Sequence, residues 1–168
     1  MNRFIINYSP DLIARDLCDK HVVKMPLEEA QMLCTTLRLH APEYAKHTGL
    51  YRAVHQKHPC TIWAGQTRAN FEFSLEMFRW MCKEYTHRYG KTHASWRLWD
   101  ALVEGAEFVP DGLLTPHPEC FSEHTELKSG NAWPLESYRK FYMTKQRRFK
   151  MVWTNRPVPE WFVQEEAA

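Results

Sequence analysis

The chain has few glycines and none of the short motifs that mark several common enzyme classes. Only six of its 168 residues are glycine, and no GxGxxG, HExxH, GxSxG, GxxxxGKS or GxxxxGKT segment occurs. These motifs bind dinucleotides, hold catalytic zinc, present an activated serine or cradle phosphates. Nucleotide hydrolysis through a P-loop and acyl transfer through a catalytic triad are therefore both unsupported.

Long apolar runs and a disulfide pattern are also missing. No apolar stretch approaches the roughly 18 residues that a membrane span requires, and the opening MNRFIINYSPD lacks the length and the cleavage site of a secretory signal. The five cysteines are odd in number and widely spaced, unlike a disulfide framework. We therefore expect a cytosolic protein without membrane contact, whose cysteines are mostly small buried hydrophobes.

What the chain does contain fits one all-α domain over residues 1–168. Its length suits a single hydrophobic core, and 44% of the residues are hydrophobic. Apolar residues recur at intervals of three and four between positions 67 and 89, as on the core-facing side of a helix. No stretch alternates as a strand would. We expect a compact set of irregularly packed helices and a long loop over residues 105–133, where Pro, Gly, His and Ser gather.

The remaining helices are predicted from capping residues and helix breakers. Ser9 as a cap and Pro10 in the first turn start a helix in SPDLIARDL, and Gly90 ends the helix over residues 67–89. We expect further helices over residues 19–40, 94–104 and 134–153, and a connector over 41–49 in which a helical turn is an alternative. We also expect a loop or short turn over 58–66 and a tail whose Trp161 and Phe162 dock on the core.

A polar stripe crosses an otherwise apolar helix near the start of the chain. On a 3.6-residue period, His21, Lys24, Glu28 and Gln31 share one face. One interpretation is a solvated face with a Lys–Glu pair, which stabilises a helix by about 0.3 kcal/mol. The other is the wall of a cleft, in which a carboxylate beside an amine and an imidazole performs acid–base work or stabilises a developing cation. Pro26 is expected to kink this helix and to open room beside Glu28.

The charges are unevenly distributed, although the net charge is only +2. Residues 100–126 contain seven acidic side chains and no Lys or Arg, whereas residues 137–156 contain seven basic side chains and no acid. Aromatic residues lie between these cations, a combination that suits phosphate contacts and base stacking. The alternative is an amphipathic helix with its aromatic residues buried and its cations in water.

Two groups of residues have spacings compatible with zinc. Cys18 and His21 form one group, and His117, Cys120 and His124 form the other. Neither includes a tight CxxC pair, and nine histidines make such spacings common. We expect no metal and no cofactor, with a zinc-stabilised helical adaptor as an alternative.

Two blocks of the chain resemble a known family of enzymes. The segment DKH at residues 19–21 is followed by Glu28, seven residues after the histidine, and HPCTIWAGQTRANFEFSLEMFRWMCKEYTHRYG combines a turn with a long, apolar-striped helix. Both blocks resemble the pyrimidine-dimer DNA glycosylases of T-even-like phages, historically named endonuclease V. That family has an Asp-x-His and a catalytic Glu at this spacing, and a P-T-x-I-L turn before a long helix. SYRKFY resembles its aromatic C-terminal region more loosely, and the two firm blocks cover residues 17–90.

The resemblance implies a DNA-repair enzyme that acts on DNA, expected to be double-stranded, in the cytosol of a bacterium or a phage-infected host. In the family, an amine attacks C1′ of a damaged nucleotide flipped out of the duplex, and the resulting imine permits strand cleavage by β-elimination. Glu28 takes the role of the catalytic glutamate. The implied nucleophile is the α-amine of Met1, because Asn2 disfavours removal of the methionine, or else Lys24 if burial lowers its pKa.

The expected site has a catalytic part and a DNA-binding part. The chain departs from the family pattern at Leu27, where the family has an Arg, and in its extra length, mainly over residues 91–133. Two alternatives stay open: an enzyme on the same scaffold that acts on hypermodified phage bases, and a non-catalytic nucleic-acid-binding protein. The expected catalytic residues are Glu28, Met1, Lys24 and His21, and the expected DNA contacts are Lys20, Gln31, Arg139, Lys140, Lys145, Arg147, Arg148 and Lys150.

Overall fold

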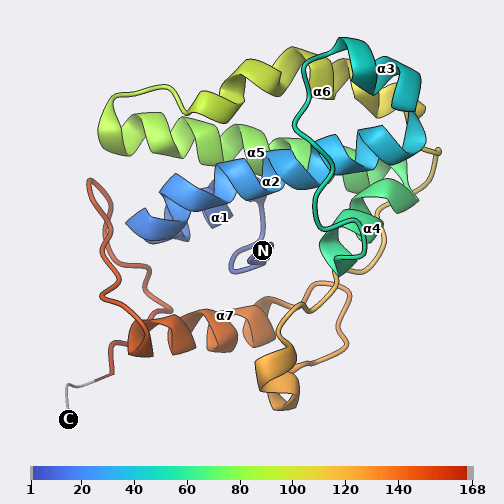
Figure 1. The fold of residues 1–168 in the computed structure, drawn as a ribbon. Coiled ribbons are helices and arrows are strands. Elements are labelled where there is room, and N and C mark those ends of the chain that lie inside the picture. The colour runs from blue at the N-terminus through green and yellow to red at the C-terminus, as the bar shows by residue number, and fades with distance from the viewer. Residues whose placement is uncertain (1, 166–168) are drawn as a thin grey trace.

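The two longest helices form where the sequence predicts them. The computed structural model describes residues 2–165, and its longest helices are α2 (Asp19–His40) and α5 (Arg68–Tyr89). Thr67 caps α5 by accepting a backbone N–H hydrogen bond from its first turn, and Gly90, at φ 65°, ends it in the left-handed conformation. The two helices lie side by side and pack against each other (Figure 1).

Shorter helices surround this pair. No strand occurs among the described residues, so the prediction of an all-α chain is confirmed, and the helices pack as one compact domain. α1 packs against α5, and α4 packs against both α2 and α5. The shorter helices are α1 (Pro10–Asp16), α3 (Pro42–His47), α4 (Pro59–Gln66), α6 (Trp99–Gly105) and α7 (Leu135–Met143), with 3-10 turns at Ala94–Leu98, Ala106–Phe108, Ser122–Leu127 and Thr144–Arg147.

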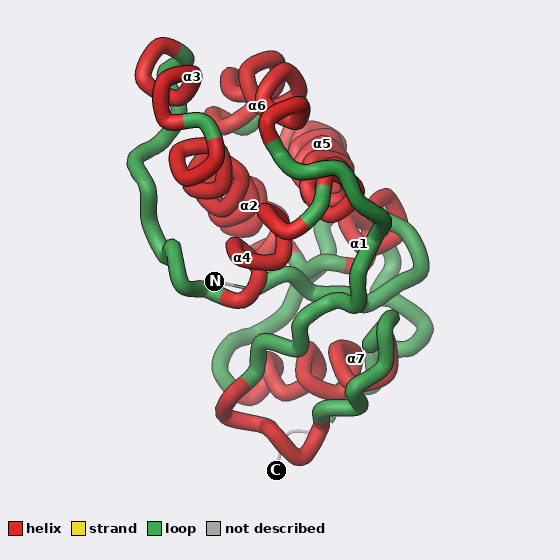
Figure 2. Tube along the Cα trace, turned by 90° about the vertical axis from the view of Figure 1, so that its right-hand side faces the viewer, coloured by secondary structure: helices red, strands yellow, loops and turns green. Residues whose placement is uncertain are grey.

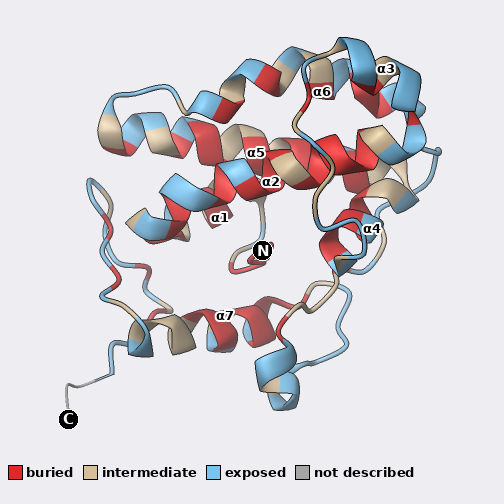
Figure 3. Cartoon of the chain, viewed as in Figure 1, coloured by how far each residue is buried: buried red, intermediate tan, exposed pale blue. Residues whose placement is uncertain are grey.

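The N-terminal arm, residues 2–8, lies between the α2–α5 pair and α7 (Figures 1 and 2). Phe4, Ile5 and Ile6 of this arm are buried, and each such side chain stabilises the fold by about 1.5–3 kcal/mol. They pack with the start of α2 and with α7, whereas the second half of α2 packs with α5 and α6. Buried residues accordingly run along both α2 and α7, while α3 is mostly exposed (Figure 3).

A buried ion pair fastens the arm to α2. Arg3 Nε lies 3.1 and 3.2 Å from the two carboxylate oxygens of Glu29, and both side chains are only 2% exposed. The Arg3 guanidinium also lies 4.9 Å from the centre of a Trp63 ring. Because an unpaired charge at this depth is strongly unfavourable, the pair fixes the position of the arm along α2.

The prediction of a loop or short turn over residues 58–66 is wrong. Pro59–Gln66 form α4, and the His58 side chain caps this helix by accepting a hydrogen bond from the Cys60 N–H at 3.1 Å. An imidazole cap is uncommon, so residue 58 carries no clear signal for a helix start. The predicted start of α1 is confirmed, with Ser9 at the N-cap position and Pro10 in the first turn, although the Ser9 hydroxyl donates to Asp11 and accepts no backbone hydrogen bond.

The C-terminal helix is shorter than the predicted range of residues 134–153. It ends at Met143, where the Thr144 backbone N–H bonds the Phe141 carbonyl three residues back, as in a 3-10 turn, and the Thr144 hydroxyl donates to the same carbonyl at 2.6 Å. The 3-10 turn Thr144–Arg147 follows. Phe162 is buried and Trp161 partly buried against the core, as predicted.

The loop predicted over residues 105–133 is confirmed apart from two short 3-10 turns. No helix in the described part of the chain is both long and apolar enough to cross a membrane.

Candidate active site

A cleft opens between the start of α2, the N-terminal arm and the segment that follows α7. Its volume is about 450 Å³, within the range of about 300–1,000 Å³ that small-molecule sites occupy. Three of the four residues in the predicted polar stripe line it, namely His21, Lys24 and Glu28. The lining residues come from four separate stretches of the chain, within residues 2–4, 20–28, 120–123 and 141–149.

Glu28 and Lys24 form the ion pair that their spacing predicts. Lys24 Nζ lies 3.1 Å from Glu28 Oε1. The carboxylate is set back in the cleft wall, with its side chain 11% exposed, whereas the Lys24 side chain is 59% exposed. Lys24 therefore lacks the burial that its predicted role as a nucleophile required. Met1, the other predicted nucleophile, lies outside the described residues.

His21 is buried and held by a contact from the far end of the chain. Its Nδ1 lies 2.7 Å from the Tyr142 hydroxyl, which also accepts a hydrogen bond from the Cys18 N–H at 2.9 Å. We assign the hydroxyl proton to the bond with Nδ1, which leaves the imidazole proton on Nε2. Burial, followed by the positive charge of Lys145, lowers the pKa of His21 to about 3. His21 is therefore neutral near pH 7 and cannot supply a positive charge to the site.

The structure places in the cleft an amine that the sequence assigned to DNA contacts. Lys145 is half-buried, and its Nζ lies 4.2 Å from the centre of the Phe141 ring. Burial, followed by repulsion from Arg148, lowers the pKa of Lys145. At a given pH, the neutral fraction of the Lys145 amine is consequently larger than that of an exposed lysine amine. Its i,i+4 spacing from Phe141 is the sequence signal that distinguishes it from the neighbouring cations.

Two further cations border the same cleft. Lys20 Nζ lies 4.3 Å from the centre of the Phe149 ring, and the Arg148 guanidinium pairs with Glu123. Hydrogen bonding to Arg148 lowers the pKa of the Glu123 carboxyl, which keeps this pair charged. The cleft thus combines a recessed carboxylate with a rim of amines and a guanidinium.

The rest of the predicted basic segment does not face the cleft. Arg147 Nη2 lies 2.7 Å from a carboxylate oxygen of Glu165, and Arg139 Nε donates to the carbonyl of Ile6 at 2.9 Å. Intramolecular partners therefore engage several cations of residues 137–156, and only some of these cations face the cleft. The other predicted contacts outside the cleft are Lys140 and Lys150, both exposed, and Gln31, which is half-buried on α2.

Neither zinc-binding group suggested by sequence spacing forms in the described part of the chain. Cys18 Sγ lies 3.5 Å from His21 Nδ1, but no third ligand atom joins them. His117 is buried against aromatic rings, and His124 Nδ1 faces a carboxylate 3.2 Å away. Cys120 converges with other residues, at the start of α4.

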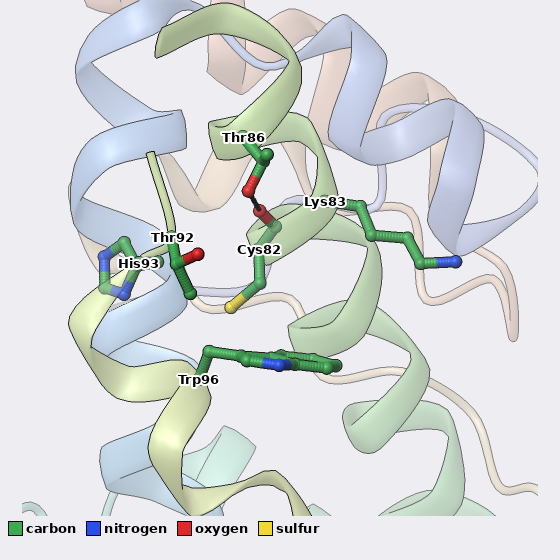
Figure 4. A pocket seen from close by; sticks show the side chains of 6 residues that line it. All are labelled: Cys82, Lys83, Thr86, Thr92, His93 and Trp96. Atoms are coloured by element: carbon green, nitrogen blue, oxygen red, sulfur yellow. Dashed lines mark hydrogen bonds between the residues drawn. The ribbon is translucent and has the colours of Figure 1, made fainter. Parts of the chain in front are cut away.

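A second pocket, shown in Figure 4, lies between α5 and the turn that follows it. Its volume is about 330 Å³, and no carboxylate occurs among the described residues that line it. The Thr86 hydroxyl in its wall donates to the Cys82 carbonyl at 3.3 Å. His93 contacts backbone groups through both ring nitrogens, the Val23 carbonyl at one and the Ser95 N–H at the other. This pocket therefore lacks an acid–base pair, and the cleft beside Glu28 is the better candidate.

Comparison of the chain with protein-family models, with curated proteins and with solved structures finds no match. The resemblance of residues 17–90 to the phage glycosylases accordingly stays a prediction. The chemistry of the cleft is the basis on which a function is proposed.

Proposed function

We propose that the protein is a DNA glycosylase that removes a damaged or modified pyrimidine and then cleaves the abasic site. One observation carries this proposal: a recessed carboxylate, Glu28, and a half-buried amine, Lys145, line one cleft together with phenyl rings. Base removal requires an anion to stabilise the positive charge that develops on the sugar. Strand cleavage through an imine requires an amine that is neutral when it attacks.

The proposed reaction begins with a nucleotide flipped into the cleft. The lone pair of the amine attacks C1′, the C1′–N1 bond breaks, and its electrons leave with the base, which takes up a proton from water. Glu28 stabilises the cationic transition state and carries the proton released by the attacking nitrogen to the ring oxygen as the sugar opens to the imine. Loss of a C2′ proton then expels the 3′ phosphate by β-elimination.

Lys145 is the described amine that best fits the attacking group. It borders the cleft, it is half-buried, and its pKa is lowered by that burial. Lys24 is mostly exposed and paired with Glu28. The α-amine of Met1 remains the nucleophile that the family resemblance implies, so mapping of the covalent adduct distinguishes the three amines.

The walls and rim of the cleft suit the other parts of a nucleotide. Phe4, Phe141 and Phe149 line it and offer faces or edges for an extruded base. Lys20 and Arg148 lie at the same opening, where they would contact the flanking phosphates. Arg148 would exchange Glu123 for a phosphate oxygen on binding.

The DNA contacts can be tested through the salt dependence of binding. Arg148→Ala should lower the slope of log affinity against log salt by about 1, as for one lost phosphate contact. Arg147→Ala is the matched control, because its guanidinium pairs with Glu165 and does not line the cleft. Equal slopes for both variants and the parent would remove Arg148 from the DNA interface.

The chemistry can be tested by incision of UV-irradiated and untreated plasmid, and by borohydride trapping on damaged and abasic duplexes. We expect nicking of irradiated DNA and a covalent adduct that Lys145→Met abolishes and the exposed control Lys140→Met retains. An adduct that persists in Lys145→Met and maps to another amine would reassign the nucleophile. Base release without any adduct would indicate water activated by Glu28.

The same panel separates the alternatives. Incision confined to duplexes with hypermodified bases would indicate the related base-directed enzyme. Binding of DNA without turnover of any irradiated, abasic or modified duplex would indicate a non-catalytic nucleic-acid-binding protein and would refute the proposal.

A further inference from the structure

Two cysteines and a histidine converge where the loop that precedes Phe121 meets the start of α4. The Sγ atoms of Cys60 and Cys120 are 3.4 Å apart, and the ligand atoms of His58, Cys60 and Cys120 all lie within 4.8 Å of one another. Among the described residues, this is the one set of three possible soft-metal ligands that converges in this way.

Backbone contacts hold both cysteines in place. Cys60 lies in the first turn of α4, and its N–H donates to the His58 side chain at 3.1 Å. The Cys120 N–H donates to the Tyr138 hydroxyl at 3.2 Å, and the Cys120 carbonyl accepts a hydrogen bond from the Asn2 side chain at 2.8 Å. The two thiols therefore need little ordering when a metal binds. His58 would give a metal the imidazole lone pair that now accepts the Cys60 N–H, because a neutral imidazole has only one such lone pair.

We propose that His58, Cys60 and Cys120 bind a zinc ion, with a water molecule as the fourth ligand. Two thiolates and an imidazole are a zinc donor set, and the sulfurs disfavour Mg²⁺ and Ca²⁺. Zn–S bonds of about 2.3 Å in a tetrahedron place two sulfurs roughly 3.8 Å apart. The sulfurs therefore need to separate by only a few tenths of an ångström, whereas a disulfide requires them to approach to about 2.05 Å.

The charges around the three ligands are compatible with a bound cation. The charge of Arg3 is balanced by Glu29, which limits its repulsion of an incoming cation. A zinc ion with two thiolates adds no net charge to this buried region.

Bound zinc would join the long loop to α4. Cys120 and the three residues after it line the cleft, so the ion would fix one wall of the candidate active site. The zinc proposal does not depend on the glycosylase proposal, since the ligands and their spacing stand without any reaction.

The test is zinc binding by the full chain, stripped with a chelator and kept reduced throughout. Titration with zinc chloride, followed by metal analysis, should give one zinc per chain, and cobalt substitution should give a thiolate-to-metal charge-transfer band. Cys120→Ser and Cys60→Ser should each weaken zinc binding by more than about 100-fold, since even substitutions beside a metal's ligands cost about 10–100-fold. Cys82→Ser, a buried thiol outside the group, should bind as the parent does.

His58→Asn extends the test without deleting the α4 cap, because asparagine retains a side-chain acceptor there. It should weaken zinc binding, with the helical circular dichroism unchanged. Failure of the reduced parent to bind zinc would overturn the proposal. Equal binding by the parent and by the double variant Cys60→Ser with Cys120→Ser would also overturn it, because the ion would then occupy another site.

Discussion

Removing the negative charge of Glu29 should destabilise the fold far more than the loss of a surface ion pair. Glu29→Gln keeps the size of the side chain but leaves the Arg3 cation buried without its counter-charge, at a site where both side chains are 2% exposed. Breaking a buried pair from one side typically costs about 3–5 kcal/mol. For a chain of this size, a loss of that magnitude lowers Tm by roughly 6–20 °C, at about 2–4 °C per kcal/mol.

The assay is urea unfolding of the parent, Glu29→Gln, Arg3→Met and the double variant, followed by tryptophan fluorescence and circular dichroism. The double variant should be more stable than Glu29→Gln alone, because it leaves no buried charge unpaired. Glu43→Gln is the matched control, since Glu43 pairs with Lys46 at the surface, where loss of a pair changes stability by about 1 kcal/mol or less. A Glu29→Gln variant as stable as Glu43→Gln would refute the argument from burial.

Three further outcomes follow from the described geometry. Glu28→Gln should slow base release by about 100-fold or more, as for the loss of a charge-stabilising group, with DNA affinity measured by anisotropy nearly unchanged; full activity would remove Glu28 from the mechanism. Because burial lowers the pKa of Lys145, the rate of borohydride trapping should rise with pH and level off below the ordinary lysine pKa of 10.5, and Lys145→Met should abolish this pH-dependent phase. Gly105→Ala should cost about 1–3 kcal/mol in urea unfolding, typical of overpacking, because a Cβ there would lie 2.3 Å from Leu37 Cδ1; a gain in stability would show that the core yields.

The long helices were predictable because their own residues specify them. α5 carries a regular apolar stripe, the Thr67 cap and the Gly90 stop within one continuous segment. α4 was missed because its cap is a histidine, and the end of α7 was missed because cations alone gave no stop signal. Local patterns therefore located the long helices but not the ends of the short ones.

Part of the candidate site was predictable for the same reason. The proximity of Lys24 and Glu28 is set by their spacing on one helix turn. The contact between His21 and Tyr142 joins residues 121 positions apart, and no pattern within either segment predicts it. The role of Lys145 was likewise hidden, since its burial depends on how α7 and the following turn pack against α2.

The Tyr142 hydroxyl, which holds both His21 and the start of α2, has a consequence for how the protein matures. During synthesis the helix that carries Glu28 leaves the ribosome long before α7 and Lys145 do, so the cleft cannot close until the last quarter of the chain has been made. A nascent or C-terminally clipped chain would therefore have no complete cleft. Fraying of the C-terminal segment would likewise open the cleft.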